Sequence, residues 1–396
     1  MFENKSIIIG VSGGIAAYKT AYLVSALSKT EADVNVIMTE NACEFISPLV
    51  FETLTENKCY VDTFDRNFKF DVEHISLAKK ADIFMIAPAT ANVIAKVANG
   101  IADDMLTTTF LASKCKKIVS PAMNTAMFEN QITQDNISKL KKYGIGVVEP
   151  QNGLLACGDT GAGKMPEPDF LFDVIEREIA REKDMLGKKV LVTAGATMES
   201  LDPVRFLTNH SSGKMGFAIA KEAMLRGAEV TVVKANTTAK IPNFVKIVEV
   251  SSAKDMFDAV TALSDQQDII VKAAAVADYT PECYVDSKIK KKDGDLSIPL
   301  KRTKDILKYL GENKREGQFL CGFSMETENM LENSKAKLSK KNADMIVANN
   351  LKDAGSGFKT DTNAVTLITR DGHRSLELKS KAEVAKEIFD EILGLI

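Results

Sequence analysis

The chain twice follows an apolar strand with a glycine-containing turn and the start of a helix. The first such run is 7–14 (IIIGVSGG), and the second is 190–195 (VLVTAG), close to the midpoint of the 396 residues. A strand that ends in small residues lets a ligand phosphate approach the backbone at a helix N-terminus, where free N–H groups point outward. Because the two turns differ in sequence, they indicate two ligand sites with different chemistries rather than a duplication.

Length and composition predict a two-domain cytoplasmic protein. A chain of this length exceeds what one hydrophobic core usually supports. With 51 basic and 54 acidic residues the net charge is −3, which gives no broad attraction for nucleic acid or an anionic membrane. No apolar run approaches the ~20 residues that span a bilayer, and a strand follows Lys5 without a signal peptide. We therefore expect no nucleic-acid or membrane partner.

The cysteines and histidines indicate neither disulfides nor a structural metal site. The six cysteines are scattered between Cys43 and Cys321 without a Cys-x-x-Cys pair, and the three histidines lie near none of them. A reducing compartment also disfavours disulfides. The identity of any metal ligands stays open.

Both halves alternate short Val- and Ile-rich strands with helices, which predicts an α/β fold of two doubly wound parallel-sheet domains. We expect these domains to be 1–186 and 187–396, joined near 185–188. Asp371-Gly372 should form a hairpin turn, since such turns need a positive φ. The expected strands are 6–9, 34–38, 83–86, 117–120 and 146–149 in the first half, with a closing helix at 170–183. In the second half they are 190–193, 229–233, 245–250, 269–273, 319–323, 345–348, 364–369 and 375–378, with a final helix from Lys381.

Two successive strands of the first half end in proline-containing polar turns, 86–92 (IAPATAN) and 120–124 (SPAMN). Open parallel sheets bind ligands at this edge, so the pair predicts backbone amides that line a flat ligand. A glycine-rich stretch, 156–168, has the spacing of a Walker A loop between Gly158 and Lys164. That interpretation fails because Met165 replaces the magnesium-binding hydroxyl and two prolines disfavour a following helix. We predict a mobile flap whose thiol, Cys157, has a chemical role.

With His74 in 72–75 (VEHI), the 121–124 motif and the Cys157 flap, the first half resembles the flavin-dependent cysteine decarboxylases. The resemblance implies that FMN oxidises the substrate's CH₂–SH to a thioaldehyde, so that the carbanion left by CO₂ loss is stabilised on sulfur. It also implies that Cys157 donates a proton to carbon, that His74 assists oxidation and decarboxylation, and that Asn124 holds the substrate. Homo-oligomers built from trimers are implied too. FMN would lie against Ser12, Gly13, Gly14, Thr39, Pro88, Ala89, Thr90 and Asn92.

The second half resembles the phosphopantothenate–cysteine ligases through 202–205 (DPVR), 209–216 (NHSSGKMG), 273–279 (AAAVADY) and 287–291 (SKIKK). In this order, both motif sets resemble the bifunctional proteins of coenzyme A biosynthesis over nearly the whole chain. The resemblance implies that the Rossmann-like second half joins 4′-phosphopantothenate to cysteine through an acyl-cytidylate, using CTP and Mg²⁺. The flavoprotein-like first half then decarboxylates 4′-phosphopantothenoylcysteine to 4′-phosphopantetheine.

By the same resemblance, Lys288 carries the triphosphate and Asn209 polarises the acyl-cytidylate during cysteine attack. Departures from the family pattern occur at 197–199 (TME), 304–306 (KDI) and 323–327 (FSMET), and the preference for CTP over ATP is inherited from the family rather than derived from these residues. The remaining implied CTP contacts are Ala273, Ala274, Asp278, Lys304, Asp305, Ile306, Leu307, Phe323, Lys337 and Lys341.

Two other classes stay open. A non-catalytic flavoprotein that regulates a partner would share the first fold, but the ligase half and the retained His74 and Cys157 disfavour it. An NAD(P)-dependent oxidoreductase would need Gly-x-Gly-x-x-Gly and an acidic residue at the end of the second strand. Neither glycine turn has that spacing, and Thr39 follows the second strand, although Glu40 comes next.

Overall fold

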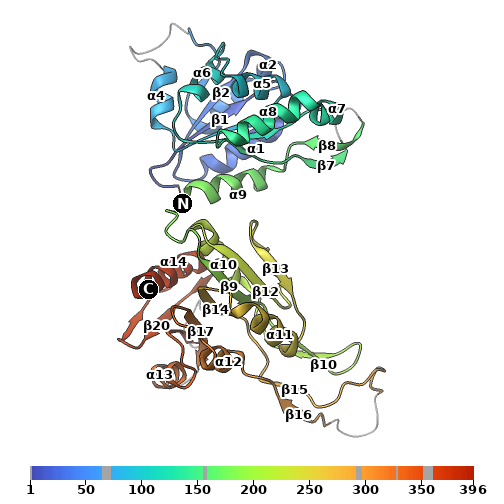
Figure 1. Ribbon diagram of the computed structural model, residues 1–396, viewed down its shortest axis with the longest axis vertical. Coiled ribbons are helices and arrows are strands. Elements are labelled where there is room, and N and C mark those ends of the chain that lie inside the picture. The colour runs from blue at the N-terminus through green and yellow to red at the C-terminus, as the bar shows by residue number, and fades with distance from the viewer. Residues whose placement is uncertain (1, 65–72, 155–157, 291–296, 327–328, 351–359) are drawn as a thin grey trace. The chain divides into compact units, whose positions relative to one another are not determined.

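The computed structural model describes residues 2–64, 73–154, 158–290, 297–326, 329–350 and 360–396. The chain divides into two compact units, Met1–Arg181 and Glu182–Ile396 (Figure 1). Met185 is buried, and its N–H donates to the carbonyl oxygen of Arg226 at 3.0 Å, so the expected joint packs on the second unit. Within the described ranges no helix is long and apolar enough to cross a membrane.

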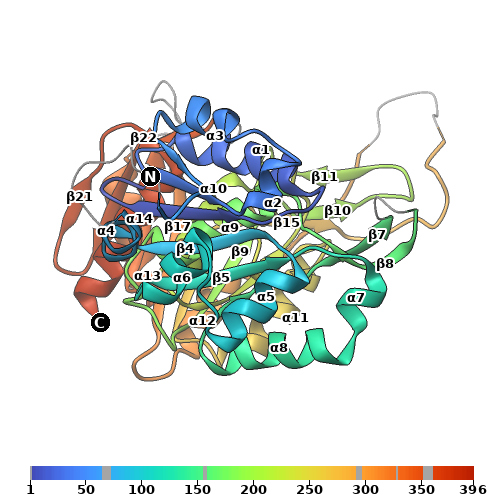
Figure 2. The same cartoon turned by 90° about the horizontal axis from the view of Figure 1, so that it is seen from above.

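Unit 1 is built on a parallel sheet of six strands in its described part, in the order β3-β2-β1-β4-β5-β6. The central strands are fully buried because helices cover both faces: α1 packs with α3 and α9, while α5 packs with α6 and α8 (Figures 1 and 2). The strands are β1 (Ser6–Val11), β2 (Asp33–Met38), β3 (Cys59–Tyr60), β4 (Ile83–Ala89), β5 (Lys116–Pro121) and β6 (Gly146–Val147). The helices are α1 (Ala17–Ser28), α2 (Glu40–Cys43), α3 (Pro48–Thr55), α4 (Glu73–Lys80), α5 (Ala91–Asn99), α6 (Met105–Ala112), α7 (Thr125–Glu129), α8 (Gln131–Lys142) and α9 (Pro168–Ile179).

The strand order of unit 1 reverses between β1 and β4. Chain connections leave in opposite directions from these neighbours, so a crevice opens beyond their carboxyl ends. The first glycine turn follows β1, and the polar turn at 86–92 begins within β4. The topology therefore brings these two predicted ligand-binding segments together.

The glycine-rich segment contributes an antiparallel hairpin of β7 (Gln151–Leu154) and β8 (Thr160–Lys164). Strand β7 is not among the strands expected from the sequence, because it is short, mostly exposed and lacks the apolar pattern of a core strand. The rejection of a Walker A loop is confirmed, since Lys164 ends a strand rather than opening a helix. The expected helix at 170–183 is α9, which begins at Pro168 and ends at Ile179.

Unit 2 repeats the strand order of unit 1 and then extends it. Its described sheet runs β13-β12-β9-β14-β17-β18-β20-β21, parallel as far as β18 and antiparallel after it. Residues of α11, α12 and α13 share one buried core, and α10 packs against α14 (Figure 1). The strands are β9 (Lys189–Ala194), β12 (Glu229–Lys234), β13 (Lys246–Glu249), β14 (Ile269–Lys272), β17 (Phe319–Glu326), β18 (Met345–Asn350), β20 (Val365–Thr369) and β21 (His373–Ser375). The helices are α10 (Lys214–Leu225), α11 (Ala253–Ser264), α12 (Ile306–Glu312), α13 (Met330–Lys340) and α14 (Lys381–Leu395).

Short strand pairs outside the main sheet are absent from the sequence prediction. They are β10 (Met198–Ser200) with β11 (Phe206–Thr208), β15 (Tyr279–Pro281) with β16 (Leu300–Arg302), and β19 (Thr362–Asn363) with β22 (Lys379–Ser380).

The terminal hairpin differs from the prediction in two ways. Its second strand is His373–Ser375 rather than 375–378. Neither Asp371 nor Gly372 adopts a positive φ, so the conformational reason given for the turn was wrong. Instead the N–H of Thr369 bonds the carbonyl oxygen of Gly372 at 3.0 Å, which closes the hairpin.

Candidate functional site

Two adjoining cavities lie at the crevice of unit 1. One has a volume of about 580 Å³ and reaches from the first glycine turn to the 121–124 motif and the β7–β8 hairpin. The other has a volume of about 640 Å³ and extends toward Thr39 and Asn92. They share Gly13, Thr90, Ala91 and Met127. Together they form one site of a size typical for a small-molecule or cofactor pocket.

Ser12 joins the two loops of this crevice. Its side chain is fully buried, and its hydroxyl donates to the carbonyl oxygen of Pro88 at 2.8 Å and accepts from the N–H of Thr90 at 3.0 Å. The next residue must be glycine, because a Cβ on Gly13 would lie 2.5 Å from the Cβ of Asn41. Ser12 therefore fixes the backbone of both loops from behind the cavities.

The helix ends at this crevice suit an anionic ligand. Helix α1 begins beside Gly13 and Gly14 with no side chain capping its N-terminus and no acidic residue in its first turn. Within this turn the N–H groups of Ala17 and Lys19 bond the carbonyl oxygens of Gly14 and Ala16, so the helix offers a phosphate the positive end of its dipole. The neighbouring helix α5 is capped by Thr90, whose hydroxyl accepts from the N–H of Val93 at 3.4 Å.

The β7–β8 hairpin docks onto the turn that contains Asn124. The N–H of Met123 donates to the carbonyl oxygen of Gly163 at 3.1 Å, and the Asn124 amide donates to the Asp159 carboxylate at 3.0 Å. Gly163 has φ +127°, and a Cβ there would lie 2.2 Å from the carbonyl oxygen of Met123. The base of the hairpin is held by the buried Lys19, which bonds Glu167 at 2.8 Å. The hairpin thus covers one end of the crevice.

The structure separates the predicted residues of unit 1 into three groups. Gly13, Gly14, Thr39, Thr90, Asn92 and Asn124 line the two cavities, whereas Ser12, Pro88 and Ala89 are buried behind them. His74 lies on α4 and lines neither cavity. Cys157 lies outside the described residues.

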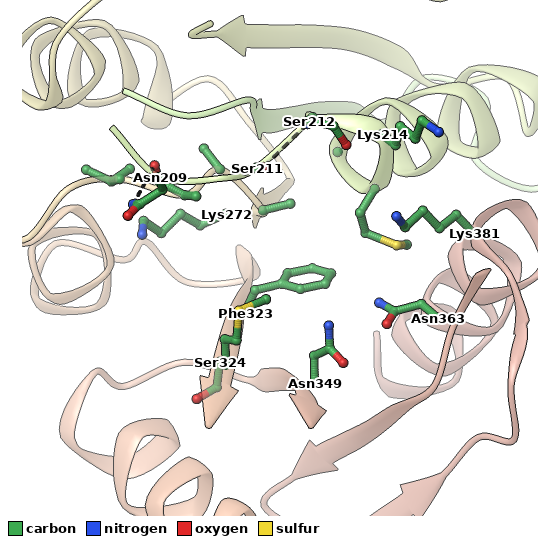
Figure 3. Close-up of a pocket in the computed structure, with 18 of the residues that line it drawn as sticks. Asn209, Ser211, Ser212, Lys214, Lys272, Phe323, Ser324, Asn349, Asn363 and Lys381 are labelled. Carbon is green, nitrogen blue, oxygen red and sulfur yellow. Dashed lines mark hydrogen bonds between the residues drawn. The ribbon is translucent and has the colours of Figure 1, made fainter. Parts of the chain in front are cut away.

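A third cavity, of about 340 Å³, lies at the carboxyl ends of β9, β14 and β17 in unit 2. Figure 3 shows Asn209 and Lys272 on one side, Lys381 and Asn363 on the other, and the Phe323 ring between them. The Asn209 amide donates to the carbonyl oxygen of Ala275 at 3.3 Å. Polar and cationic groups thus surround one aromatic ring, an arrangement suited to a ligand with a planar part and a negative charge.

Hydrogen bonds between the turn after β9 and the loop after β14 hold the floor of this cavity. The hydroxyl of Thr193 accepts from the N–H of Ala274 at 3.0 Å, and that of Thr197 accepts from the N–H of Ala277 at 3.0 Å. The N–H of Ala275 donates to the carbonyl oxygen of Gly195 at 2.9 Å. The second glycine turn therefore fixes the loop after β14.

Of the residues predicted for this site, Asn209, Ala273, Ala274, Asp278, Phe323 and Lys337 line the cavity. Others lie away from it. Lys304 stacks over the Phe257 ring at 4.6 Å, and Lys341 forms an ion pair with Asp305. Asp305 also caps α12, in which Ile306 and Leu307 are buried core residues. Lys288 lies on an exposed segment and does not line the cavity.

Sequence reasoning missed several polar residues of this cavity, notably Lys272, Asn349, Asn363 and Lys381. Burial and, after it, the positive charge of Lys337 lower the pKa of Lys272 to about 8, although part of the Lys272 side chain faces the cavity. The signal available was a charged residue at the end of an apolar strand. Among the described residues no group of three His, Cys, Asp or Glu side chains could hold a metal ion.

Comparison with known proteins covers both units. Residues 185–395 match the family described as "DNA/pantothenate metabolism flavoprotein C-terminal domain", and residues 1–180 match the family described as "Flavoprotein". The chain is 46% identical over 399 residues to the coenzyme A biosynthesis bifunctional protein CoaBC of Bacillus subtilis (strain 168), covering 100% of this chain and 98% of that one. It is 41% identical over 393 residues to the protein of the same name from Escherichia coli (strain K12), covering 98% and 97%.

Solved structures are similar to each unit separately. The crystal structure of the C-terminal domain of a CoaBC protein is 45% identical with a TM-score of 0.46, covering 53% of this chain and 96% of that one. A PPC decarboxylase mutant complexed with pantothenoylaminoethenethiol is 30% identical with a TM-score of 0.40, covering 43% and 96%.

Proposed function

We propose that this chain, which belongs to the family of bifunctional coenzyme A biosynthesis proteins, both forms and decarboxylates 4′-phosphopantothenoylcysteine. Family membership makes it a decarboxylase and ligase of coenzyme A biosynthesis. The observation that carries the finer assignment is the presence of one ligand-sized cavity system at the crevice of each unit. We assign decarboxylation to residues 1–186 and ligation to 187–396, in the cytoplasm.

FMN is the cofactor we propose for unit 1. The residues fit it, because the uncapped first turn of α1 beside Gly13 and Gly14 suits its phosphate. Thr39, Thr90 and Asn92 would line the rest of the site, while Ser12, Pro88 and Ala89 keep the loop backbones in place. When bound, FMN supplies the two-electron oxidation and reduction that decarboxylation of an unactivated carbon requires.

The chain's own residues would hold the substrate and move protons. Asn124 stands at the cavity wall with its amide N–H directed to a carboxylate, that of Asp159, so it is suited to binding a substrate carboxylate. The docked hairpin would exclude water from the site. We propose Cys157 as the proton donor to carbon and His74 as an assisting group. Because His74 lines neither cavity of its own chain, we propose that a trimer-based homo-oligomer completes the site.

In unit 2 we propose that 4′-phosphopantothenate attacks the α-phosphate of CTP, forming an acyl-cytidylate and releasing pyrophosphate. The amine of cysteine then attacks the acyl carbon and expels CMP. Asn209 would polarise the acyl group, Phe323 would pack beside the base, and Ala273, Ala274 and Asp278 would contact the nucleotide. Lys337 and the segment that carries Lys288 would face the phosphates of CTP. Mg²⁺ would bind the same phosphates. The other predicted CTP contacts would support the nucleotide site from outside the cavity. Their side chains are buried, joined in an ion pair or placed over an aromatic ring; these residues are Lys304, Asp305, Ile306, Leu307 and Lys341.

The test supplies the purified full chain with 4′-phosphopantothenate, cysteine and either CTP or ATP, and follows pyrophosphate and CO₂. We expect both products with CTP. Lys288→Gln should abolish pyrophosphate release while the variant still decarboxylates added 4′-phosphopantothenoylcysteine. Cys157→Ser should release CO₂ but fail to reduce the enethiol product. A flavin-containing protein that performs neither step would favour the regulatory alternative.

A further inference from the structure

The described part of the exposed segment that carries Lys288 is attached to the rest of unit 2 at three places, the first of them Glu282, whose N–H donates to the carbonyl oxygen of Pro299 at 3.0 Å. We define the arm as residues 282–290, which follow β15. Every arm residue except Ile289 is exposed, so side-chain packing does little to fix it. The N–H of Val285 donates to the carbonyl oxygen of Leu201 at 3.2 Å, and the N–H of Ile289 donates to the carboxylate of Asp202 at 3.1 Å. Lys288 lies between the second and third of these attachments, next to the third.

Asp202 is a buried carboxylate whose two oxygens have different partners. Its exposure is 2%, and it lies between β10 and β11. Oδ1 accepts from the backbone N–H groups of Val204 and Arg205, each at 2.8 Å. Oδ2 accepts from the Arg205 guanidinium at 3.0 and 2.7 Å and from the N–H of Ile289. One oxygen thus builds the local turn, while the other binds the arm.

The Arg205 guanidinium completes the attachment. Besides bonding Asp202, its Nη2 donates to the carbonyl oxygen of Ile289 at 2.6 Å. The N–H and the C=O of Ile289 are therefore held by one carboxylate–guanidinium pair. Burial alone would raise the pKa of Asp202, but the N–H groups of Ile289 and Val204 and the Arg205 side chain hold the pKa well below its ordinary value. The carboxylate is thus charged at neutral pH, which strengthens these bonds.

We propose that Asp202 is a positioning residue for the ligase reaction and fixes Lys288 by binding the adjacent Ile289 amide. The inference rests on the proposed role of Lys288. A reacting group that shifts by about 1 Å can lose on the order of a hundredfold in rate, so a lysine on an exposed arm needs an anchor close to it.

The structure offers a selective variant, Asp202→Asn. An asparagine can keep its oxygen toward the Val204 and Arg205 N–H groups, whereas its NH₂ group would face the donors of Arg205 and Ile289. The turn is retained and the arm is released. In the full chain we expect the ligase kcat to fall about tenfold to a hundredfold, with the decarboxylation of added 4′-phosphopantothenoylcysteine unchanged. The Ile289 amide should also exchange its hydrogen faster.

Asp268→Asn is the matched control. The Asp268 carboxylate likewise accepts from a backbone N–H, that of Lys189 at 2.9 Å, and from an arginine side chain, that of Arg315. It lies at the opposite ends of β9 and β14 from the cavity. We expect this variant to keep its ligase kcat. An equal loss in both variants would show a general structural effect and overturn the proposal.

Comparison with variants of Lys288 separates the proposal from its premise. If Asp202 acts through Lys288, adding Asp202→Asn to Lys288→Arg, which keeps the charge, should lower the ligase rate by less than Asp202→Asn lowers the rate of the parent protein. Full activity of Lys288→Gln would refute the role of Lys288 itself. Loss of activity in Lys288→Gln with full activity in Asp202→Asn would refute only the positioning role.

A second variant covers the case in which Asp202→Asn does not fold. Ile289→Pro removes the N–H donor and leaves the other bonds of Asp202 intact, and Lys290→Pro places the same ring one residue further along. We expect a fall in ligase kcat for Ile289→Pro alone. Equal effects of the two prolines, or no effect of either, would overturn the proposal.

Discussion

Lys272 should make nucleotide binding to unit 2 depend on pH above neutrality. Burial and the neighbouring charge of Lys337 lower its pKa to about 8, while Asp305 and Asp278 oppose this and Lys341 adds to it. An anionic ligand in the same cavity favours the charged lysine and raises its pKa toward the ordinary value of 10.5. Above pH 8 binding must therefore take up a proton.

The size of the effect follows from linkage. With a free-protein pKa near 8 and a bound pKa near its ordinary value, affinity falls by up to tenfold for each pH unit between them. CTP should thus bind roughly tenfold more weakly at pH 9 than at pH 7, which corresponds to about 1.4 kcal/mol. Without nucleotide the sign for folding is opposite to the usual lysine case. The depressed pKa costs stability at low pH, and this cost is lost as the pH rises from about 8 to 10.5.

Calorimetric titration of the full chain with CTP at pH 7, 8 and 9, in two buffers of different ionisation enthalpy, measures both affinity and proton uptake. Lys272→Met should bind CTP more weakly at pH 7 and show no uptake at pH 9. Lys254→Met is the control, because Lys254 is an exposed lysine paired with Asp258 on α11. Equal pH dependence of the Lys272→Met variant and the parent protein would refute the reasoning.

Two further substitutions test the packing around the sites. Gly163→Ala should undock the β7–β8 hairpin and reduce the decarboxylation rate at least tenfold while flavin is retained. Gly153→Ala in the same hairpin is the control, because its Cβ would lie 3.5 Å from the nearest side-chain atom. Equal decarboxylation rates in the two variants would argue against docking. Arg226→Met removes the guanidinium that pairs with the buried Glu222 carboxylate at 3.1 Å and should lower the free energy of unfolding by about 3–5 kcal/mol in urea titrations. Arg370→Met removes an exposed hydrogen bond and should cost less than about 1 kcal/mol, so a similar loss in both would contradict the burial argument.

The sequence predicted the elements that carry a continuous apolar signal. Strands such as β1 and β4 are buried on both faces, so their Val- and Ile-rich runs leave little choice of structure. Their polar ends could be assigned to ligand sites because parallel strands terminate at one edge. The short strand pairs β10–β11 and β15–β16 lack such a signal, since their strands are largely exposed.

Of the residues inferred from family motifs, some line a cavity and others do not. Lys304 and Ile306 belong to one motif, yet one stacks on an aromatic ring and the other lies in the core. A motif marks a segment and does not distinguish contacts of side chains from those of the backbone. Lys272 was missed for the converse reason. Its environment depends on Lys337, which lies far away in the sequence and approaches only through the packing of α13 on the sheet.

Each unit has a site at its own crevice, and the two sites are formed in different ways. In unit 1 the proposed phosphate site is the first turn of α1, and the buried Ser12 joins the loop before this helix to the turn at 86–92, so the site is largely formed by the fold itself. In unit 2 the cations Lys272 and Lys337 repel each other in the cavity, and Lys288 is held outside it on an arm. An anionic nucleotide relieves that repulsion and gives the arm a partner. The ligase site should therefore be completed by its substrate, and hydrogen exchange of residues 282–290 should slow when CTP binds.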